Sequence, residues 1–274
     1  MDVLPPISPI VLIRSAGEMA SGIAWRLHRA NVRRLWMVDL GDPLCVRRTV
    51  AFCPALEDGS ATVEGVEAVA AGSAAAIFAA WRNGQIAVVR TADWSAIQGI
   101  VPDVVVDAII AKRNLGTRIG DAPLVIGLGP GFAAGVDCHV VVETNRGHHL
   151  GRLIHHGSAE PDTGMPGDIA GYTAQRVLRA PLSGVFRSDR AIGQRVAVGE
   201  TVGQVGDAPV IAGVEGILRG LIRPGTAVSA GLKLGDVDPR CEPQHCHTVS
   251  DKARALGGAV LEAVMHHCNR PSFA

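Results

Sequence analysis

Glycine turns and an acidic residue follow the first predicted strands of the chain. Gly17 and Gly22 lie in the turn and first helical segment after one strand, and Asp39 ends the next strand 22 residues after Gly17. This arrangement is typical of dinucleotide sites, because a helix N-terminus holds the pyrophosphate and an acid about 20 residues on holds a ribose hydroxyl. Ser15 at the first glycine position and Glu18 beside the phosphate position depart from the pattern.

A group of cations follows the apolar segment 104–110. Lys112, Arg113 and Asn114 leave the carboxyl end of that predicted buried strand, which is where open α/β sheets bind ligands. Lysine acts on a phosphate as a point charge, whereas arginine can hold it with two hydrogen bonds. A solvated loop would have the same composition, but the position at a strand end favours anion binding.

A glycine turn at 129–131 follows the next predicted strand and offers backbone N–H groups to an anion. If consecutive strands are neighbours, the three loops meet at one edge of the sheet. We therefore predict a phosphate-binding cleft. Its predicted residues are Gly17, Gly22, Asp39, Lys112, Arg113, Asn114, Gly129 and Gly131.

No residue pattern assigns a catalytic role or a metal site. His139 could transfer protons, whereas the neighbouring Cys138 is expected to face the core, as free cysteines usually do. Cys241, Cys246 and His247 have the residue types of metal ligands but lack the paired short spacing of structural zinc sites. We expect no bound metal.

Apolar runs alternate with helical patterns in the first half of the chain, which predicts an α/β fold with a Rossmann-like, mainly parallel sheet. The runs lack polar alternation, as buried parallel strands do. The segments 138–144 and 150–156 indicate a hairpin. The predicted strands are 10–14, 35–39, 86–90, 104–110 and 124–128, with an alanine-rich helical stretch around 68–82.

Residues 180–237 carry a sequence that is repeated at an offset of 32, so that Gly184, for example, recurs as Gly216. Short β-branched stretches punctuated by glycines predict brief strands and tight turns. This duplicated all-β module is similar to the biotinyl/lipoyl, or barrel-sandwich, domain. That resemblance places a carrier lysine between the halves, but 206–209 contains no lysine, so a carrier role is not expected.

The pattern predicts three parts. Residues 1–172 form the Rossmann-like α/β domain, 173–240 the biotinyl/lipoyl-like module without its carrier lysine, and 241–274 a C-terminal helix that packs back on the α/β domain. Ser250 or Asp251 would cap that helix.

The 274 residues carry 26 basic and 26 acidic side chains, so the sequence has no electrostatic signature of nucleic-acid or anionic-membrane binding. The apolar runs are shorter than the roughly 20 residues that span a bilayer. The start of the sequence lacks the pattern of a signal peptide, and six irregularly spaced cysteines do not indicate a disulfide framework. We expect a cytoplasmic protein without nucleic-acid or membrane partners.

Six blocks carry a family resemblance when they are taken together: 13–22, 43–52, 106–117, 127–137, 143–148 and 249–255. Their order resembles the accessory protein family named for the selenium-dependent molybdenum hydroxylase system. The resemblance implies association with a client molybdenum enzyme of the xanthine-dehydrogenase type, in maturation or insertion of its cofactor. That cofactor is a pterin bearing a phosphate, sometimes extended to a dinucleotide, which suits a cleft with Lys112 and Arg113.

Three functions are compatible with the sequence. The first is a maturation protein that binds a nucleotide or molybdopterin-type ligand in the α/β cleft and docks the client enzyme through the β module. The second is an NAD(P)-dependent oxidoreductase in which Asp39 holds the ribose and Lys112 or His139 transfers a proton. The third is a scaffold without a small ligand. The sequence leaves open whether the protein is an enzyme and whether it forms a homo-oligomer.

Overall fold

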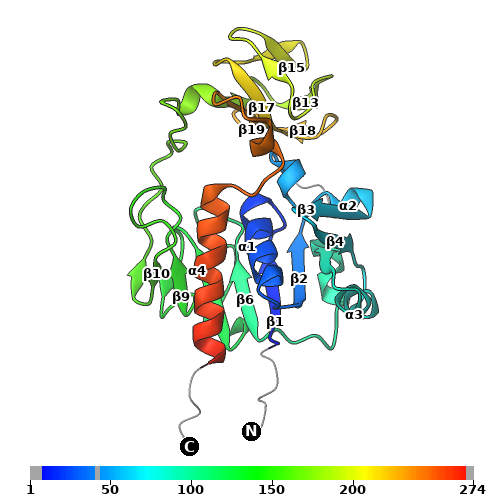
Figure 1. The fold of residues 1–274 in the computed structure, drawn as a ribbon, viewed down its shortest axis with the longest axis vertical. Coiled ribbons are helices and arrows are strands. Elements are labelled where there is room, and N and C mark those ends of the chain that lie inside the picture. Colours follow the sequence, from blue (N-terminus) through cyan, green and yellow to red (C-terminus); the bar gives the residue numbers. More distant parts are fainter. Residues whose placement is uncertain (1–7, 41–43, 270–274) are drawn as a thin grey trace, which may run out of the picture.

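The computed structural model describes residues 8–40 and 44–269, which form an α/β part and a smaller β module (Figure 1). In these residues the α/β part contains a nine-stranded sheet. In spatial order, its strands are β10 (Leu153–Ile154), β9 (Val140–Val142), β7 (Leu124–Leu128), β6 (Val104–Asp107), β1 (Ile10–Arg14), β2 (Arg34–Asp39), β5 (Ile86–Arg90), β4 (Val66–Ala70) and β3 (Ser60–Val63).

Helices cover both faces of this sheet. One apolar core lies between the sheet and the pair α1 (Glu18–Arg29) and α4 (Asp251–Cys268), and a second lies on the opposite face with α3 (Ala74–Arg82). The short helical segments are α2 (Ala55–Asp58), η1 (Arg48–Val50), η2 (Thr91–Ala96), η3 (Ile119–Asp121), η4 (Ala174–Arg176) and η5 (Pro243–Cys246).

Helices α1 and α4 approach closely through glycines. A Cβ at Gly22 would lie 2.7 Å from the Cβ of Ala253, and one at Gly257 would lie 2.9 Å from the carbonyl oxygen of Gly22. Ser250 caps α4, since its hydroxyl accepts a hydrogen bond from the Ala253 amide at 3.3 Å. This confirms the prediction that Ser250 or Asp251 begins the helix.

The β module has its own core, formed between short antiparallel strands. Its two sheets have the same strand order, because each strand of one sheet corresponds through the sequence repeat to the strand at the same place in the other sheet. One sheet contains β12 (Val177–Arg179), β19 (Lys233–Asp238), β17 (Gly216–Leu221) and β14 (Arg195–Val196), and the other β16 (Ala208–Ile211), β15 (Thr201–Val205), β13 (Gly184–Arg187) and β18 (Ala227–Val228). A further pair joins β8 (Ala133–Ala134) and β11 (Gly157–Ser158).

The predicted fold class, a Rossmann-like, mainly parallel sheet joined to a biotinyl/lipoyl-like module, is wrong. The main sheet is mixed, because antiparallel pairs form both of its edges: β3 with β4, and β10 with β9. The connections after β6 and β7 contain no α-helix within the described residues, and α4 from the far end of the chain covers that part of the sheet. The β module is divided into separate four-stranded antiparallel sheets. Strand pairing is not encoded in local patterns, which is why the sequence did not reveal it.

Several local predictions are confirmed. Strands occupy 10–14, 86–90 and 124–128 as predicted, and β9 and β10 form the predicted hairpin. The helical stretch predicted around 68–82 is only partly correct, because β4 occupies its beginning and α3 starts at Ala74. No helix in the described part of the chain is both long and apolar enough to cross a membrane.

Candidate functional site

The β module lies over the carboxyl ends of the central parallel strands (Figure 1). The loops that follow β1, β2, β6 and β7 all leave the sheet at this edge. The junction between the two parts therefore contains the loops that the sequence singled out, together with elements of the β module and the start of α4.

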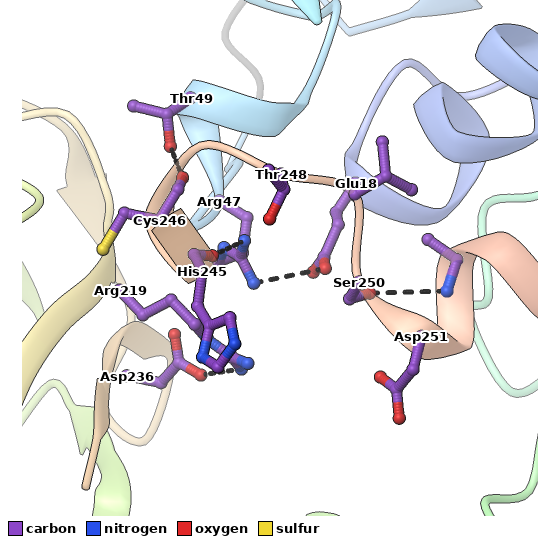
Figure 2. Close-up of polar contacts among 12 residues, drawn as sticks. Glu18, Arg47, Thr49, Arg219, Asp236, His245, Cys246, Thr248, Ser250 and Asp251 are labelled. Atoms are coloured by element: carbon purple, nitrogen blue, oxygen red, sulfur yellow. Dashed lines mark hydrogen bonds and ion pairs between the residues drawn. The ribbon is translucent and has the colours of Figure 1, made fainter. Parts of the chain in front are cut away.

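Arg47 connects α1 with the segment before α4 at this junction (Figure 2). Its side chain is only 3% exposed; Nη1 lies 3.4 Å from a Glu18 carboxylate oxygen, and Nη2 donates to the carbonyl oxygen of His245 at 2.8 Å. Nearby, the Thr49 hydroxyl donates to the carbonyl oxygen of Cys246 at 2.5 Å. The loop after β2 is thus tied both to α1 and to the segment before α4.

The same loop is hydrogen-bonded to the β module. The Leu221 amide of β17 donates to the carbonyl oxygen of Val46 at 2.8 Å, and Arg48 Nε donates to the carbonyl oxygen of Leu221, also at 2.8 Å. Gly220 permits this approach, because a Cβ there would lie 2.7 Å from a methyl group of Val46 and 3.0 Å from Arg47 Cδ. The two parts are therefore held together by backbone contacts that tolerate little added volume.

Two cavities lie at this junction. The strand-end cavity, of about 550 Å³, is lined by Gly17, Asp39 and the loop 108–110. The linker cavity, of about 490 Å³, lies beside the segment 160–169. Both are lined in addition by Glu18, Met19, Lys233 and Lys252.

Positive charge predominates on the walls of the linker cavity, which include six cationic and four acidic side chains. Most of the cations have acidic partners: Lys112 lies 3.0 Å from Asp162, and Arg176 and Arg219 both contact the buried Asp236, at 3.0 and 2.5 Å. Arg146 is paired with Asp251. These pairs fix the walls of the cavity and neutralise most of their charge.

Lys233 and Lys252 are the exceptions. Both side chains are half-buried, and in the described residues neither ammonium has a hydrogen-bond or ion-pair partner. Burial lowers the pKa of Lys233, and burial together with the charges of Lys112 and Arg146 lowers the pKa of Lys252. Unpaired cations inside a cavity are costly, and the wall shared by both cavities has the charge that would suit an anion.

The loop after β1 is fastened by Asp39. One of its carboxylate oxygens accepts hydrogen bonds from the Ala16 amide and, at 3.3 Å, from the Ser15 hydroxyl, and the other accepts from the Leu40 amide at 2.7 Å. Burial raises the pKa of the Asp39 carboxyl, whereas these hydrogen bonds act in the opposite direction. Asp39 is therefore engaged by the chain itself.

Ser15 adopts a backbone conformation that usually requires glycine. Its φ of +99° is rare for a residue with a side chain, and its hydroxyl accepts from the Gly17 amide at 3.1 Å. Ile110 and Lys112, at the other side of the junction, also have positive φ angles, of 56° and 64°. Such conformations cost about 1–3 kcal/mol each and concentrate at functional sites.

The loop after β6 is held by a buried carboxylate. The Thr117 hydroxyl donates to Asp107 at 2.6 Å, and Arg14 lies 3.2 Å from the same oxygen. The Asn114 side chain closes the loop by accepting from the Gly116 and Thr117 amides. Asn114 therefore shapes the loop internally.

The glycine turn after β7 contacts this loop. A Cβ at Gly131 would lie 2.5 Å from the Arg113 Cα, and one at Gly129 would lie 2.5 Å from the Thr144 hydroxyl. Both glycines have positive φ, 78° and 104° in chain order. The close packing of this turn against its neighbouring segments thus explains why both positions hold glycine.

Of the predicted ligand residues, Gly17 and Asp39 line the strand-end cavity and Lys112 lines the linker cavity. The other five line neither of these two cavities: Gly22, Arg113, Asn114, Gly129 and Gly131. Gly22 serves the contact of α1 with α4, and Arg113 is exposed.

Lys233 and Lys252 were not among the predicted residues, because both come from parts of the chain far from the predicted cleft. A signal for Lys233 does exist in the repeat. Lys233 and Asp236 stand where the first copy has the uncharged Thr201 and Gln204. Charge gained in one copy of a duplicated strand could have indicated that this copy faces a site.

His139 lies away from the junction. Its Nδ1 accepts a hydrogen bond from the Val125 amide at 2.9 Å. Val125 is near the amino end of β7, so His139 lies at the opposite end of the sheet from the junction. All six cysteines are free thiols, and no group of three or more His, Cys, Asp or Glu side chains in the described residues is arranged to hold a metal ion.

No family model matches the chain. It is 48% identical over 256 residues to the protein described as "Uncharacterized protein YqeB" of Escherichia coli (strain K12), and the match covers 93% of this chain and 47% of that protein. The chain therefore spans about half the length of this relative.

Among solved structures, a succinylglutamate desuccinylase/aspartoacylase from Rhodobacter sphaeroides is 26% identical over 23% of this chain and 22% of that chain, with a TM-score of 0.22. An aspartoacylase family protein from Mesorhizobium loti is 12% identical over 84% of this chain and 85% of that chain, with a TM-score of 0.27. TM-scores this low assign neither a fold nor an activity to the chain.

Proposed function

We propose that the protein is an accessory protein for maturation of a molybdenum hydroxylase, and that it binds a phosphate-bearing nucleotide or molybdopterin-type ligand at the junction between the α/β part and the β module. The observation that carries the proposal is the pair Lys233 and Lys252, whose ammonium groups lack partners among the described residues and line both cavities. The association with a molybdenum enzyme rests on the family resemblance of the sequence blocks.

The size and charge of the junction support a ligand of this class. The two cavities measure about 490 and 550 Å³ and share the wall with the two lysines, so a phosphate group held there leaves room for a ring system in either cavity. A phosphate would supply the countercharge that the lysines lack. The strained loops around Ser15 and Lys112 border the same space.

The arrangement disfavours the alternative of an NAD(P)-dependent oxidoreductase. Glu18 places a carboxylate at the start of α1, where a dinucleotide-binding fold would hold the pyrophosphate, and pairs there with Arg47. Asp39 is engaged by backbone amides and Ser15, and His139 lies at the other end of the sheet. Lys112, the other residue considered for proton transfer, is paired with Asp162.

A thermal-shift and calorimetric series tests ligand binding. CDP, CTP, NAD, NADP and molybdenum cofactor are compared with the uncharged bases. A ligand that is present at 100 times its Kd should add about 2.7 kcal/mol to the free energy of unfolding. We expect a shift from phosphate-bearing ligands and none from neutral bases. Lys233→Met and Lys252→Met should remove the shift, whereas Arg113→Met, an exposed cation outside both cavities, should retain it.

The maturation role has its own test. Purified apoenzyme of a molybdenum hydroxylase is incubated with molybdenum cofactor, with and without the protein, and its activity is followed over time. We expect faster activation with the wild-type protein than with the Lys233→Met variant. Equal activation with and without the protein would contradict the maturation role, and an absence of any shift in the ligand series would contradict the binding site.

A further inference from the structure

Two cysteines lie together on the wall of the strand-end cavity. Cys45 follows β2, and Cys53 precedes α2, so that η1 separates them in the chain. Cys45 is half-buried, whereas Cys53 is 1% exposed and belongs to the apolar core against which Cys45 packs. Both line the cavity. The more accessible thiol, Cys45, thus shares the cavity wall with an almost fully buried one, Cys53.

Cys45 is also the neighbour with the largest effect on the Cys53 thiol. The Cys45 side chain and burial together raise the pKa of Cys53 far above its usual value. Arg48 lies close enough to act electrostatically on Cys45. Cys246 differs, because its thiol is directed to the carbonyl oxygen of Leu218 at 3.8 Å. Cys45 is therefore the thiol that a reagent in the cavity meets first, with Cys53 placed behind it.

We propose that Cys45 and Cys53 form a redox-active dithiol, which closes to an intramolecular disulfide by exchange with a small anionic disulfide in the strand-end cavity. Their common position on the cavity wall and in one apolar cluster carries the proposal. Lys233 and Lys252 line the same cavity and favour entry of an anionic reagent. The proposal does not depend on the ligand proposed above.

The exchange proceeds in two steps. The Cys45 thiolate attacks one sulfur of the small disulfide, so that a mixed disulfide forms, the S–S bond of the reagent breaks, and one small thiol leaves with a proton from solvent. Cys53 then attacks the sulfur of Cys45, and its proton passes to the departing small thiolate, which leaves as the second small thiol. Overall, two protein thiols are oxidised to a disulfide and one small disulfide is reduced to two thiols.

Peptide mapping under non-reducing conditions tests the proposal on the full chain. The reduced protein is incubated with oxidised glutathione, remaining thiols are alkylated in denaturant, and the peptides are analysed by mass spectrometry. We expect the peptides containing Cys45 and Cys53 to be joined. Recovery of both as alkylated thiols, or of Cys45 joined to another cysteine, overturns the proposal.

Variants separate the two steps. Cys53→Ser should accumulate the mixed disulfide of Cys45 with glutathione, and Cys45→Ser should leave Cys53 unmodified, because Cys53 is only 1% exposed. Cys246→Ser is the matched control and should still form the link. If Cys53→Ser leaves Cys45 unmodified, attack by Cys45 is excluded.

A second measurement on the wild-type protein avoids substitution of the buried Cys53. Phenylarsine oxide binds two adjacent thiols at once, so it should protect Cys45 and Cys53 together from alkylation, and should leave Cys241 accessible. Alkylation of Cys45 at an unchanged rate in the presence of the arsenical would overturn the proposal.

Discussion

Lys233 of β19 and Lys252 of α4 line the same two cavities, and neither ammonium has an ion-pair partner in the described part of the chain. The surrounding cations differ in this respect, since Lys112, Arg146, Arg176 and Arg219 are all paired with acids. Removing two like charges from water without a direct ion-pair partner opposes folding, although the charge of Asp236 offsets part of this cost for Lys233. Their retention is understandable if a ligand supplies the negative charge.

The first prediction is that Lys233→Met stabilises the protein without ligand. The substitution keeps an apolar chain of similar length and removes the charge that burial penalises. We expect a gain of ~0.5–2 kcal/mol in the free energy of unfolding, the range typical of such relief, measured by denaturant titration. Lys112→Met, at an exposed cation paired with Asp162, should change stability by less than about 0.5 kcal/mol. Destabilisation by Lys233→Met would show that the ammonium is stabilised by the folded chain.

The second prediction is that stability and ligand binding both depend on pH through Lys233 and Lys252. Because the folded state lowers the pKa of Lys233 and Lys252 below the ordinary 10.5, the unfolded chain binds more protons between the lowered values and 10.5. In that window the free energy of unfolding of the ligand-free protein should rise with pH. A bound phosphate favours the charged lysines, so binding should take up protons there and weaken as the pH rises through the lowered pKa values. Calorimetry in buffers of different ionisation enthalpy measures this uptake, and proton release on binding would contradict the assignment.

Several strands of the α/β part could be predicted because each of them is a continuous apolar run. Ile10–Arg14 and Leu124–Leu128 were predicted to the residue. The hairpin of β3 and β4 was not, since its alternating small and polar residues resemble the start of the alanine-rich helix that follows. Pairing of this hairpin with the sheet edge is a long-range event, which is why the fold class was predicted incorrectly.

The candidate site was predictable only in part, for the same reason. Lys112 follows a buried strand, and the carboxyl ends of parallel strands are where open α/β sheets bind their ligands. Lys252 and Lys233 reach the site through the packing of α4 on α1 and of the β module on the loop after β2. Neither contact leaves a local pattern in the sequence.

The third prediction concerns Gly220. In the Gly220→Ala variant the new Cβ would lie 2.7 Å from a Val46 methyl group, 2.9 Å from an Asp236 carboxylate oxygen and 3.0 Å from Arg47 Cδ. The β module would have to move away from the loop after β2, so we expect a loss of ~1–3 kcal/mol, as for overpacked interiors. Faster hydrogen exchange of the Leu221 amide, which donates to Val46, should accompany it.

Gly72→Ala is the control for this substitution, because a Cβ at Gly72 meets nothing within 4 Å. It should leave both the stability and the exchange of the Leu221 amide unchanged. If Gly220→Ala behaves like Gly72→Ala, the junction tolerates more volume than its contacts indicate.

The fourth prediction is that Asp238 contributes stability that is lost in acid. Its side chain is 1% exposed; Arg240 lies 2.7 Å away and Arg219 3.5 Å away. Burial alone would raise the pKa of this carboxyl, but the hydrogen bonds from Arg240 and the charge of Arg219 lower it to about 2, from 3.8. Since the folded pKa is depressed, the contribution is fully present above the unfolded value of 3.8 and disappears as the pH falls towards 2.

Asp238→Asn should therefore destabilise the protein at neutral pH by no more than about 2 kcal/mol, the energy equivalent of the shift before solvent screening. The difference between variant and wild type should shrink as the pH falls from 4 to 2, because the wild type then loses the same charge. Denaturant titrations across that range measure the effect. Asp162→Asn, at an exposed carboxylate beside Lys112, should leave the free energy of unfolding unchanged. A difference for Asp238→Asn that stays constant down to pH 2 would mean that the amide is penalised for its shape and not for the lost charge.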